Sequence, residues 1–188
     1  MRLAIIGVTG MVGREILDVL AGRNFPIDEL IPVASKNSCG QLISYNCMEF
    51  TIISLDDLLK KEVDMALFSA GGKVSEIWAP KLAAKGCKVI DNSSFWRMNE
   101  NYKLIVPEIN GNELVNEDMI IANPNCSTIQ LVMTLAPLHK KYSVKRVVVS
   151  TYQSISGTGK KAVEQLENEE LSIDGDMVYP HPIYKNVL

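Results

Sequence analysis

Short apolar runs alternate along the chain with segments whose apolar residues recur at helical spacing. The apolar runs predict buried strands, and the periodic segments predict amphipathic helices. The expected strands lie at residues 2–7, 30–34, 63–69, 87–91 and 119–122, with one or two short strands within 41–53. The expected helices lie at residues 10–21, 56–60, 74–85, 126–142 and 159–170. This alternation predicts an α/β fold with a mostly parallel sheet covered by helices on both faces.

A different pattern begins at Val144. Residues 144–152 read VKRVVVSTY, a longer and more alternating β-branched run that predicts a strand opening a second unit. We place the domain boundary between Asn125 and Val144, and we assign residues 1–128 to the first domain and 129–188 to the second. The chain stops at HPIYKNVL with no helix stop signal. The second domain is therefore expected to be truncated.

Composition excludes several classes of protein. Apolar residues make up 47% of the 188 positions, enough for a core, while the net charge of −3 argues against a nucleic-acid binder. No apolar run is long enough to span a bilayer, and the glycine-interrupted start is no signal peptide. The four cysteines form no CxxC pair, so neither a metal site nor a disulfide framework is indicated. We expect a cytoplasmic protein that binds neither membrane nor nucleic acid.

Three glycines, Gly7, Gly10 and Gly13, lie in the turn GVTGMVG between the first strand and the first helix. Glycines let backbone N–H groups approach a pyrophosphate, and a helix N-terminus favours its negative charge. The turn therefore predicts a dinucleotide site in a Rossmann-like domain. Because the spacing is GxxGxxG rather than GxGxxG, a tight turn without a ligand is the alternative.

The second strand ends in ASKNS, without the carboxylate that would bind a ribose 2′-hydroxyl. Lys36 and the hydroxyl of Ser38 suit a 2′-phosphate instead, so the sequence favours NADP over NAD. A solvated loop with an ordinary lysine is the alternative.

Cys126 follows a predicted strand and a proline turn in IIANPNCST, and it opens a predicted helix. A helix N-terminus stabilises a thiolate, and its amides can hold the oxyanion that forms when the thiolate attacks a carbonyl. Cys39, Cys47 and Cys87 lack this setting. The alternative is that Cys126 is a small buried apolar residue.

Six motifs occur in order along the chain: GVTGMVG, SAGG, DNSSFWRM, VPEIN, NPNCST and TYQSISGTG. Together they resemble the aspartate-semialdehyde dehydrogenase family over essentially the whole chain. The resemblance implies a Rossmann-like domain followed by the start of an α+β catalytic and dimerisation domain.

The resemblance also implies roles for particular residues. Cys126 matches the nucleophile that forms an acyl thioester, Arg97 a phosphate-binding arginine and Gln153 a substrate-contacting glutamine. The positions that match cofactor contacts of the family are Thr9, Gly10, Met11, Val12, Asn37, Ser38, Ser156 and Gly157. We expect Gly7, Gly13, Lys36, Ser69 and Ala70 to belong to the cofactor site as well. The family often carries arginine where this chain has Asn37, which weakens the case for a 2′-phosphate unless Lys36 compensates.

Two of these roles also follow from position. Arg97 comes just after the predicted strand end IDNSS, where open α/β sheets bind ligands, and its guanidinium can hold phosphate through two hydrogen bonds. Gln153 follows the predicted strand 144–152, where a neutral amide can orient a polar substrate. The alternatives are an ordinary surface arginine and a surface residue at a strand end.

No histidine in the chain is well placed to act as the general base that a thiol nucleophile needs. His139 lies late in the helix that Cys126 opens, about 20 Å away by helix rise. His181 lies beyond the last predicted helix, and nothing requires it to fold back. The resemblance places the base, a substrate-binding arginine and a phosphate-binding lysine beyond Leu188, so we expect this chain alone to be inactive.

The implied reaction is the reversible NADP-dependent oxidation of L-aspartate-4-semialdehyde with phosphate to 4-aspartyl phosphate. It serves lysine (through diaminopimelate), threonine and methionine biosynthesis, and the implied full-length enzyme is a homodimer or homotetramer. One alternative is N-acetyl-γ-glutamyl-phosphate reductase, although that family usually has glycine before the cysteine and this chain has Asn125. The other is a catalytically silent NADP-binding module.

Overall fold

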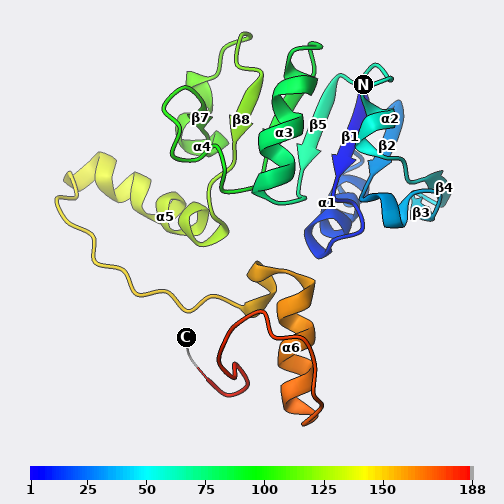
Figure 1. The fold of residues 1–188 in the computed structure, drawn as a ribbon. Helices are drawn as coiled ribbons and strands as arrows, with labels where there is room; N and C mark the ends of the chain where they lie inside the picture. The colour runs from blue at the N-terminus through cyan, green and yellow to red at the C-terminus, as the bar shows by residue number, and fades with distance from the viewer. Residues whose placement is uncertain (187–188) are drawn as a thin grey trace. The chain divides into compact units, whose positions relative to one another are not determined.

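The early apolar runs form one parallel sheet (Figure 1). Its strands, in spatial order, are β2 (Glu29–Val33), β1 (Arg2–Ile6), β5 (Met65–Phe68), β6 (Lys88–Asp91), β8 (Ile120–Ala122) and β7 (Lys103–Leu104). Every adjacent pair in this sheet is parallel, with β1 at the switch point between β2 and β5. A separate antiparallel hairpin joins β3 (Leu42–Tyr45) to β4 (Met48–Thr51). The predicted α/β class and mostly parallel sheet are confirmed.

Helices cover both faces of the sheet, because each strand buries both sets of its alternating side chains. On β1, Ala4 and Ile6 join a core cluster with Leu82 of α3 (Gly72–Ala83) and residues of α2 (Leu55–Leu58). Ile5 points to the opposite face and packs in a second cluster with Leu17 of α1 (Met11–Gly22). The two clusters place the core on either side of the sheet.

The structure is a computed structural model that describes residues 1–186, and it divides into a first unit, Met1–Ser143, and a second unit that begins at Val144. The first unit also holds α4 (Pro107–Asn110), α5 (Cys126–Tyr142) and two short 3₁₀ helices, η1 (Lys36–Ser38) and η2 (Gly111–Glu113). The second holds η3 (Ile155–Thr158) and α6 (Lys160–Glu170). The assignment of residues 1–128 and 129–188 to two domains stays a prediction.

The expected strand at residues 144–152 is wrong for this structure. These residues form no strand, and Val147, Val148 and Tyr152 are exposed. A β-branched run favours extended backbone but becomes a strand only when a neighbour pairs with its N–H and C=O groups. The described part of the second unit contains no strand that could pair with them. Gln153 consequently does not lie at a strand end.

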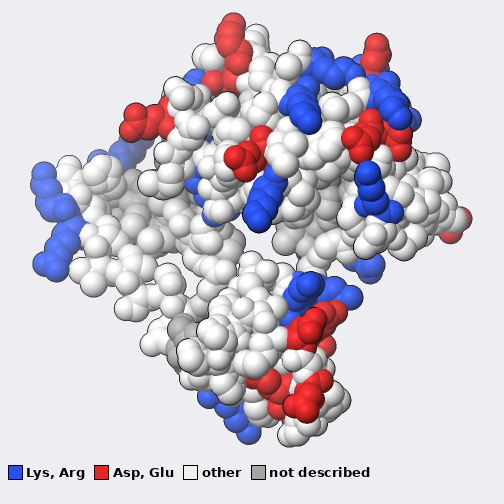
Figure 2. Space-filling view, viewed as in Figure 1, with Lys and Arg blue, Asp and Glu red and all other residues white. Residues whose placement is uncertain are grey.

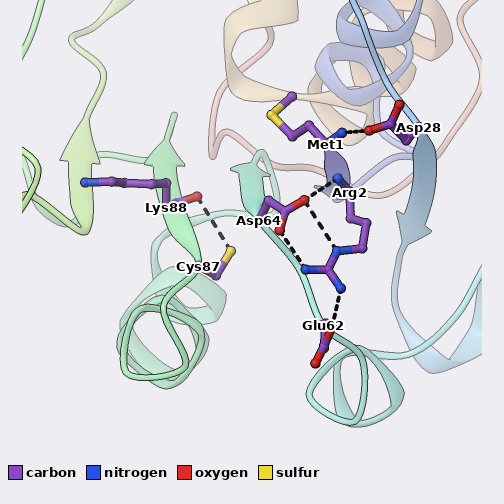
Figure 3. Close-up of polar contacts among 7 residues, drawn as sticks. All are labelled: Met1, Arg2, Asp28, Glu62, Asp64, Cys87 and Lys88. Atoms are coloured by element: carbon purple, nitrogen blue, oxygen red, sulfur yellow. Dashed lines mark hydrogen bonds and ion pairs between the residues drawn. The ribbon is translucent and has the colours of Figure 1, made fainter.

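Ion pairs secure the amino-terminal edge of the sheet, opposite the ends that carry the predicted site (Figure 3). Arg2 donates its backbone N–H and two guanidinium nitrogens to Asp64, which precedes β5, and also pairs with Glu62. Hydrogen bonds from the Arg2 side chain lower the pKa of Asp64 to about 2. Nearby, burial raises the pKa of the Cys87 thiol to about 12, so this cysteine forms little thiolate at neutral pH and is unreactive.

Charges of both signs are spread over the surface drawn in Figure 2, and basic side chains gather at the end of α5. His139, Lys140 and Lys141 occupy the last turn of this helix, where cations interact favourably with the helix dipole. Within the described residues, no helix combines the length and the hydrophobicity needed to cross a membrane.

Replacing Gly7 by alanine should destabilise the first unit strongly. Gly7 has a φ of +87°, and a Cβ there would lie 2.3 Å from the carbonyl oxygen of Ser69. Positive φ and a backbone clash together should cost about 2 kcal/mol or more in free energy of unfolding. Urea unfolding followed by the fluorescence of buried Trp96 measures this.

The control is Gly22→Ala in α1, where a Cβ meets no atom within 4 Å. Alanine favours a helix over glycine, so this variant should be neutral or slightly stabilised. Equal unfolding midpoints for Gly7→Ala and the wild type would contradict the close approach.

Candidate active site

The predicted site residues of the first unit gather at the carboxyl edge of the sheet. Because β1, β2, β5, β6 and β8 run parallel, their carboxyl ends lie along one edge. The segments that leave this edge are Gly7–Gly13, Ala34–Ser38, Ser69–Gly71, Asn92–Arg97 and Asn123–Cys126. In open α/β sheets this edge beside a switch point is where ligands bind.

The glycine turn folds back over the end of β2. Gly7 and Val8 donate their N–H groups to the carbonyl of Val33, at 2.9 and 3.2 Å, and Gly10 donates to Gly7 at 3.0 Å. A Cβ on Gly13 would lie 2.3 Å from the Gly7 carbonyl oxygen, so only glycine lets α1 start this close to the turn. Gly10 is the N-cap and has no side chain with which to cap α1. The first-turn amides are thus placed for an anion such as a pyrophosphate.

Ser69 and Ala70 lie directly beside the glycine turn. The N–H of Ser69 donates to Ile6 at 2.8 Å, which continues the pairing of β1 with β5 beyond the strands. Gly71 follows with a φ of +85° and is the N-cap of α3. The structure therefore brings two predicted cofactor positions, far apart in sequence, next to Gly7.

Residues 36–38 form η1 just after β2, at the carboxyl edge of the sheet. No carboxylate follows Val33 until well past this loop, which fits the sequence interpretation. The Lys36 ammonium is exposed and lies 3.9 Å from the Asp56 carboxylate, so this pairing is weak in water. Lys36 thus has the exposure needed to meet a phosphate, in competition with Asp56.

Cys126 is the first residue of α5, as predicted, and its side chain is exposed. The interpretation of Cys126 as a small buried residue is therefore wrong; it fits Cys87, which is buried. The Asn125 side chain caps α5 by accepting hydrogen bonds from the N–H groups of Ser127 and Thr128, at 3.0 and 3.3 Å. The cap fixes the start of the helix. It also occupies two of the backbone N–H groups that were expected to stabilise an oxyanion.

Arg97 is half-buried and is not an ordinary surface arginine. Its Nε donates to the carbonyl of Asn123 at 2.9 Å, and its Nη2 donates to the carbonyl of Asn92 at 3.0 Å. Two N–H donors of Arg97, the residue predicted to bind phosphate, thus form hydrogen bonds within the protein. Any anion would have to be held by Nη1 and the remaining proton of Nη2.

The sequence reasoning missed the polar residues that shape this edge. Asp91, fully buried at the end of β6, accepts hydrogen bonds from the N–H and the hydroxyl of Ser93, at 3.1 and 2.5 Å. The side-chain amide of Asn123 donates to the side-chain oxygen of Asn92 at 2.7 Å. A signal was present, since acidic and amide residues directly after buried strands are typical of hydrogen-bonded turns.

In the second unit, Gln153 lies against η3, which contains Ser156 and Gly157. A Cβ on Gly157 would lie 2.2 Å from the Gln153 side-chain nitrogen, so the amide needs glycine there. Gln153 lines a cavity of about 760 Å³ with, among others, Thr158, Tyr179 and Ile183. The hydroxyls of Thr158 and Tyr179 are 2.6 Å apart and tie two of its walls together.

Two side chains of α6 hold the segment that forms the far wall of this cavity. Gln165 is buried, and its side-chain oxygen accepts from the N–H groups of Val178 and Tyr179, at 2.7 and 2.9 Å. Glu169 accepts from Ile183 and Tyr184, at 2.6 and 2.7 Å, and from Gln165 at 2.8 Å. These bonds, that from Gln165 first, lower the pKa of Glu169.

The two histidines lie in different units of the structure. His139 lies in the last turn of α5, at the opposite end from Cys126. His181 belongs to the second unit, where its carbonyl is within 3.4 Å of Gln165. Within residues 1–186, no three His, Cys, Asp or Glu side chains are grouped closely enough to hold a metal ion.

Family models match both units. The semialdehyde dehydrogenase NAD-binding domain matches residues 2–117, and the semialdehyde dehydrogenase dimerisation domain matches residues 135–187. The chain belongs to the semialdehyde dehydrogenase family. The first match contains the glycine turn and Arg97, and the second contains Gln153.

Similar proteins carry the name that the motifs suggested. The chain is 48% identical to an aspartate-semialdehyde dehydrogenase of Aquifex aeolicus over 196 residues, covering 100% of this chain and 58% of the relative. It is 49% identical to one from Rickettsia bellii over 173 residues, covering 91% and 51%. The chain thus spans about half the length of the curated relatives it matches. The resemblance to aspartate-semialdehyde dehydrogenases is confirmed.

A solved structure is similar as well. Aspartate semialdehyde dehydrogenase II from Vibrio cholerae, complexed with ASA, has a TM-score of 0.90 at 37% identity, and the match covers 98% of this chain and 57% of that one. The Rossmann-like NAD-binding fold followed by the start of a dimerisation domain is thereby confirmed.

Replacing Glu169 by alanine should loosen residues 178–184 at neutral pH. The change leaves the N–H groups of Ile183 and Tyr184 without their acceptor, so amide hydrogen exchange in this segment should accelerate. Since the folded-state pKa of Glu169 is lowered, its stabilisation is present above the ordinary glutamate range and is lost as the pH falls through the lowered value. The difference between variant and wild type should therefore vanish in acid.

Glu170→Ala is the matched control, because Glu170 is exposed on the same helix. It should exchange like the wild type at every pH. A Glu169→Ala difference that persists in strong acid would contradict the carboxylate's role.

Proposed function

We propose that the chain provides the cofactor-binding unit and the nucleophile of an NADP-dependent aspartate-semialdehyde dehydrogenase. The observation that carries this proposal is the placement of exposed Cys126, on the first turn of α5, at the same sheet edge as the glycine turn. One edge thus offers a nucleophile and an anion-binding helix terminus together. The sequence similarity to named aspartate-semialdehyde dehydrogenases supports the choice of substrate.

In the proposed reaction the Cys126 thiolate attacks the aldehyde carbon of L-aspartate-4-semialdehyde. The helix N-terminus that Asn125 caps favours the negative sulfur. Bound NADP⁺ supplies the acceptor for the hydride that leaves this carbon. The resulting thioester is cleaved when a phosphate oxygen attacks the carbonyl carbon, which forms 4-aspartyl phosphate and returns the thiolate. Run in reverse, the reaction supplies lysine, threonine and methionine biosynthesis.

The cofactor proposal rests on the shape of the carboxyl edge. A Cβ at Gly7 would clash with the Ser69 carbonyl and one at Gly13 with the Gly7 carbonyl, so only glycine allows this tight turn, and Thr9 to Val12 lie within it. We assign the 2′-phosphate to Lys36, Asn37 and Ser38, and the contacts beside the turn to Ser69 and Ala70. Ser156 and Gly157 of the second unit are assigned a further cofactor contact.

In this proposal Arg97 binds phosphate and Gln153 contacts the substrate. Arg97 keeps Nη1 for an anion, and Gln153 presents its amide at a cavity with both polar and apolar walls. We further propose a cytoplasmic homodimer or homotetramer, in line with the match to a dimerisation domain.

The proposed cofactor preference predicts that NADPH binds this chain more tightly than NADH. Replacing Lys36 by alanine should remove a charge-assisted contact to the 2′-phosphate and weaken NADPH roughly tenfold, with little effect on NADH. Fluorescence titration with both nucleotides measures this. Lys60→Ala, at another exposed lysine, is the control. Equal affinities in the wild type would rule out the preference.

The proposed nucleophile predicts that iodoacetamide at neutral pH labels Cys126 before the other cysteines. Cys39 and Cys47 are also exposed, but neither opens an α-helix, and Cys87 is buried. Peptide mapping over time gives the order of labelling. Cys126→Ser should remove the fast phase and leave the slow ones. Faster labelling of Cys39 or Cys47 would count against the assignment.

A further inference from the structure

Two side-chain hydrogen bonds join the loop after β6 to the turn after β8. Arg97 belongs to the loop after β6; it donates across to the backbone carbonyl of Asn123 and, within its own loop, to the backbone carbonyl of Asn92. The Asn123 side-chain amide donates to the Asn92 side-chain oxygen at 2.7 Å. The backbone N–H of Asn123 also donates to the Asp91 carbonyl at 2.8 Å, so the two segments are linked up to the residue before Pro124.

This link matters because no side chain of α5 is fully buried. One face of the helix, with Ile129 and Leu135, is half-buried, whereas Met133 and Leu138 are exposed. Only Asn123, Pro124 and Asn125 separate the end of β8 from Cys126. The hydrogen bonds of Asn123 therefore constrain where α5 begins and where Cys126 lies relative to the sheet.

We propose that Arg97 is a positioning residue for Cys126. The proposal rests on the proposed function only in taking Cys126 as the nucleophile. Two carbonyls on different loops need two donors in one rigid group, which a guanidinium provides and a lysine ammonium at the end of a flexible chain does not. A positive charge at position 97 is therefore not sufficient to hold Asn123 and the start of α5 in place. The planar guanidinium, with two donors in fixed directions, is needed.

The test compares Arg97→Lys with the wild type, with Arg23→Lys at an exposed arginine as the control. The first readout is the rate of Cys126 alkylation at neutral pH divided by the rate for exposed Cys39 in the same sample. If the start of α5 loosens, the thiolate loses the helix terminus, and this ratio should fall roughly three- to tenfold. Millimolar guanidinium added to Arg97→Ala should restore the ratio, whereas ammonium should not.

The second readout is amide hydrogen exchange of residues 123–130, which does not depend on thiol chemistry. It should accelerate in Arg97→Lys, and to a smaller extent in Asn92→Ala, which removes only the acceptor for the Asn123 amide. Arg97→Gln, which keeps at most one of the two donors, replaces Arg97→Lys if that variant does not fold, as judged by Trp96 fluorescence. Wild-type alkylation ratio and exchange in folded Arg97→Lys, or in Arg97→Gln where Arg97→Lys does not fold, would overturn the proposal.

The two proposals fail in different ways. If wild-type Cys126 is not labelled first, the assignment of the nucleophile fails, while the exchange data still report on the Arg97 link. If labelling order holds and the Arg97 variants match the wild type, the link fails and the proposed function stands.

Discussion

The contact between Gly7 and Ser69 is the constraint on which the candidate site depends. Parallel pairing of β1 with β5 brings the two strand ends together, and the pairing continues to Ser69 beyond both strands. The chain can turn at this point only because residue 7 has no side chain and adopts a positive φ. The turn then places Gly13 against the Gly7 carbonyl and directs the start of α1 toward the sheet edge. Cofactor binding follows from this geometry.

A different kind of interaction secures the nucleophile. The glycine turn is set by close backbone packing above a buried core, whereas Cys126 starts a helix without buried side chains. Its position relies on hydrogen bonds from Asn125, Arg97 and Asn123. The thiol at this position is exposed, as the proposed attack on an aldehyde requires. Polar anchoring makes the position of the thiol sensitive to substitutions that leave the core intact.

Much of the fold could be predicted from the sequence because its signals are local. The apolar run before GVTG and the periodic segment after NPN correspond to β1 and to α5, which spans Cys126–Tyr142 as expected. The short elements β7 and α4 carry too few residues to show a period. The run at Val144 misled because strand formation depends on a partner, which a local pattern does not contain.

The placement of the candidate site residues in the fold could be predicted, but their hydrogen bonding could not. Cys126 and the glycines follow from the position of a helix start. Arg97 donates two hydrogen bonds to backbone carbonyls, and Asp91 is buried. Both features depend on which loops meet at the sheet edge, which a local sequence pattern does not contain. Gln165 looks like a surface residue of a polar helix, yet it is buried because residues 178–184 fold over it.

Amide hydrogen exchange with and without NADPH tests most directly whether the carboxyl edge is a cofactor site. The account predicts slower exchange on NADPH addition in residues 8–14 and 69–73, since the first-turn amides of α1 and the end of β5 would be covered. The ion-paired edge at Arg2 and Asp64, at the other end of the same strands, should exchange unchanged. Protection confined to that opposite edge, or no protection at saturating NADPH, would contradict the account.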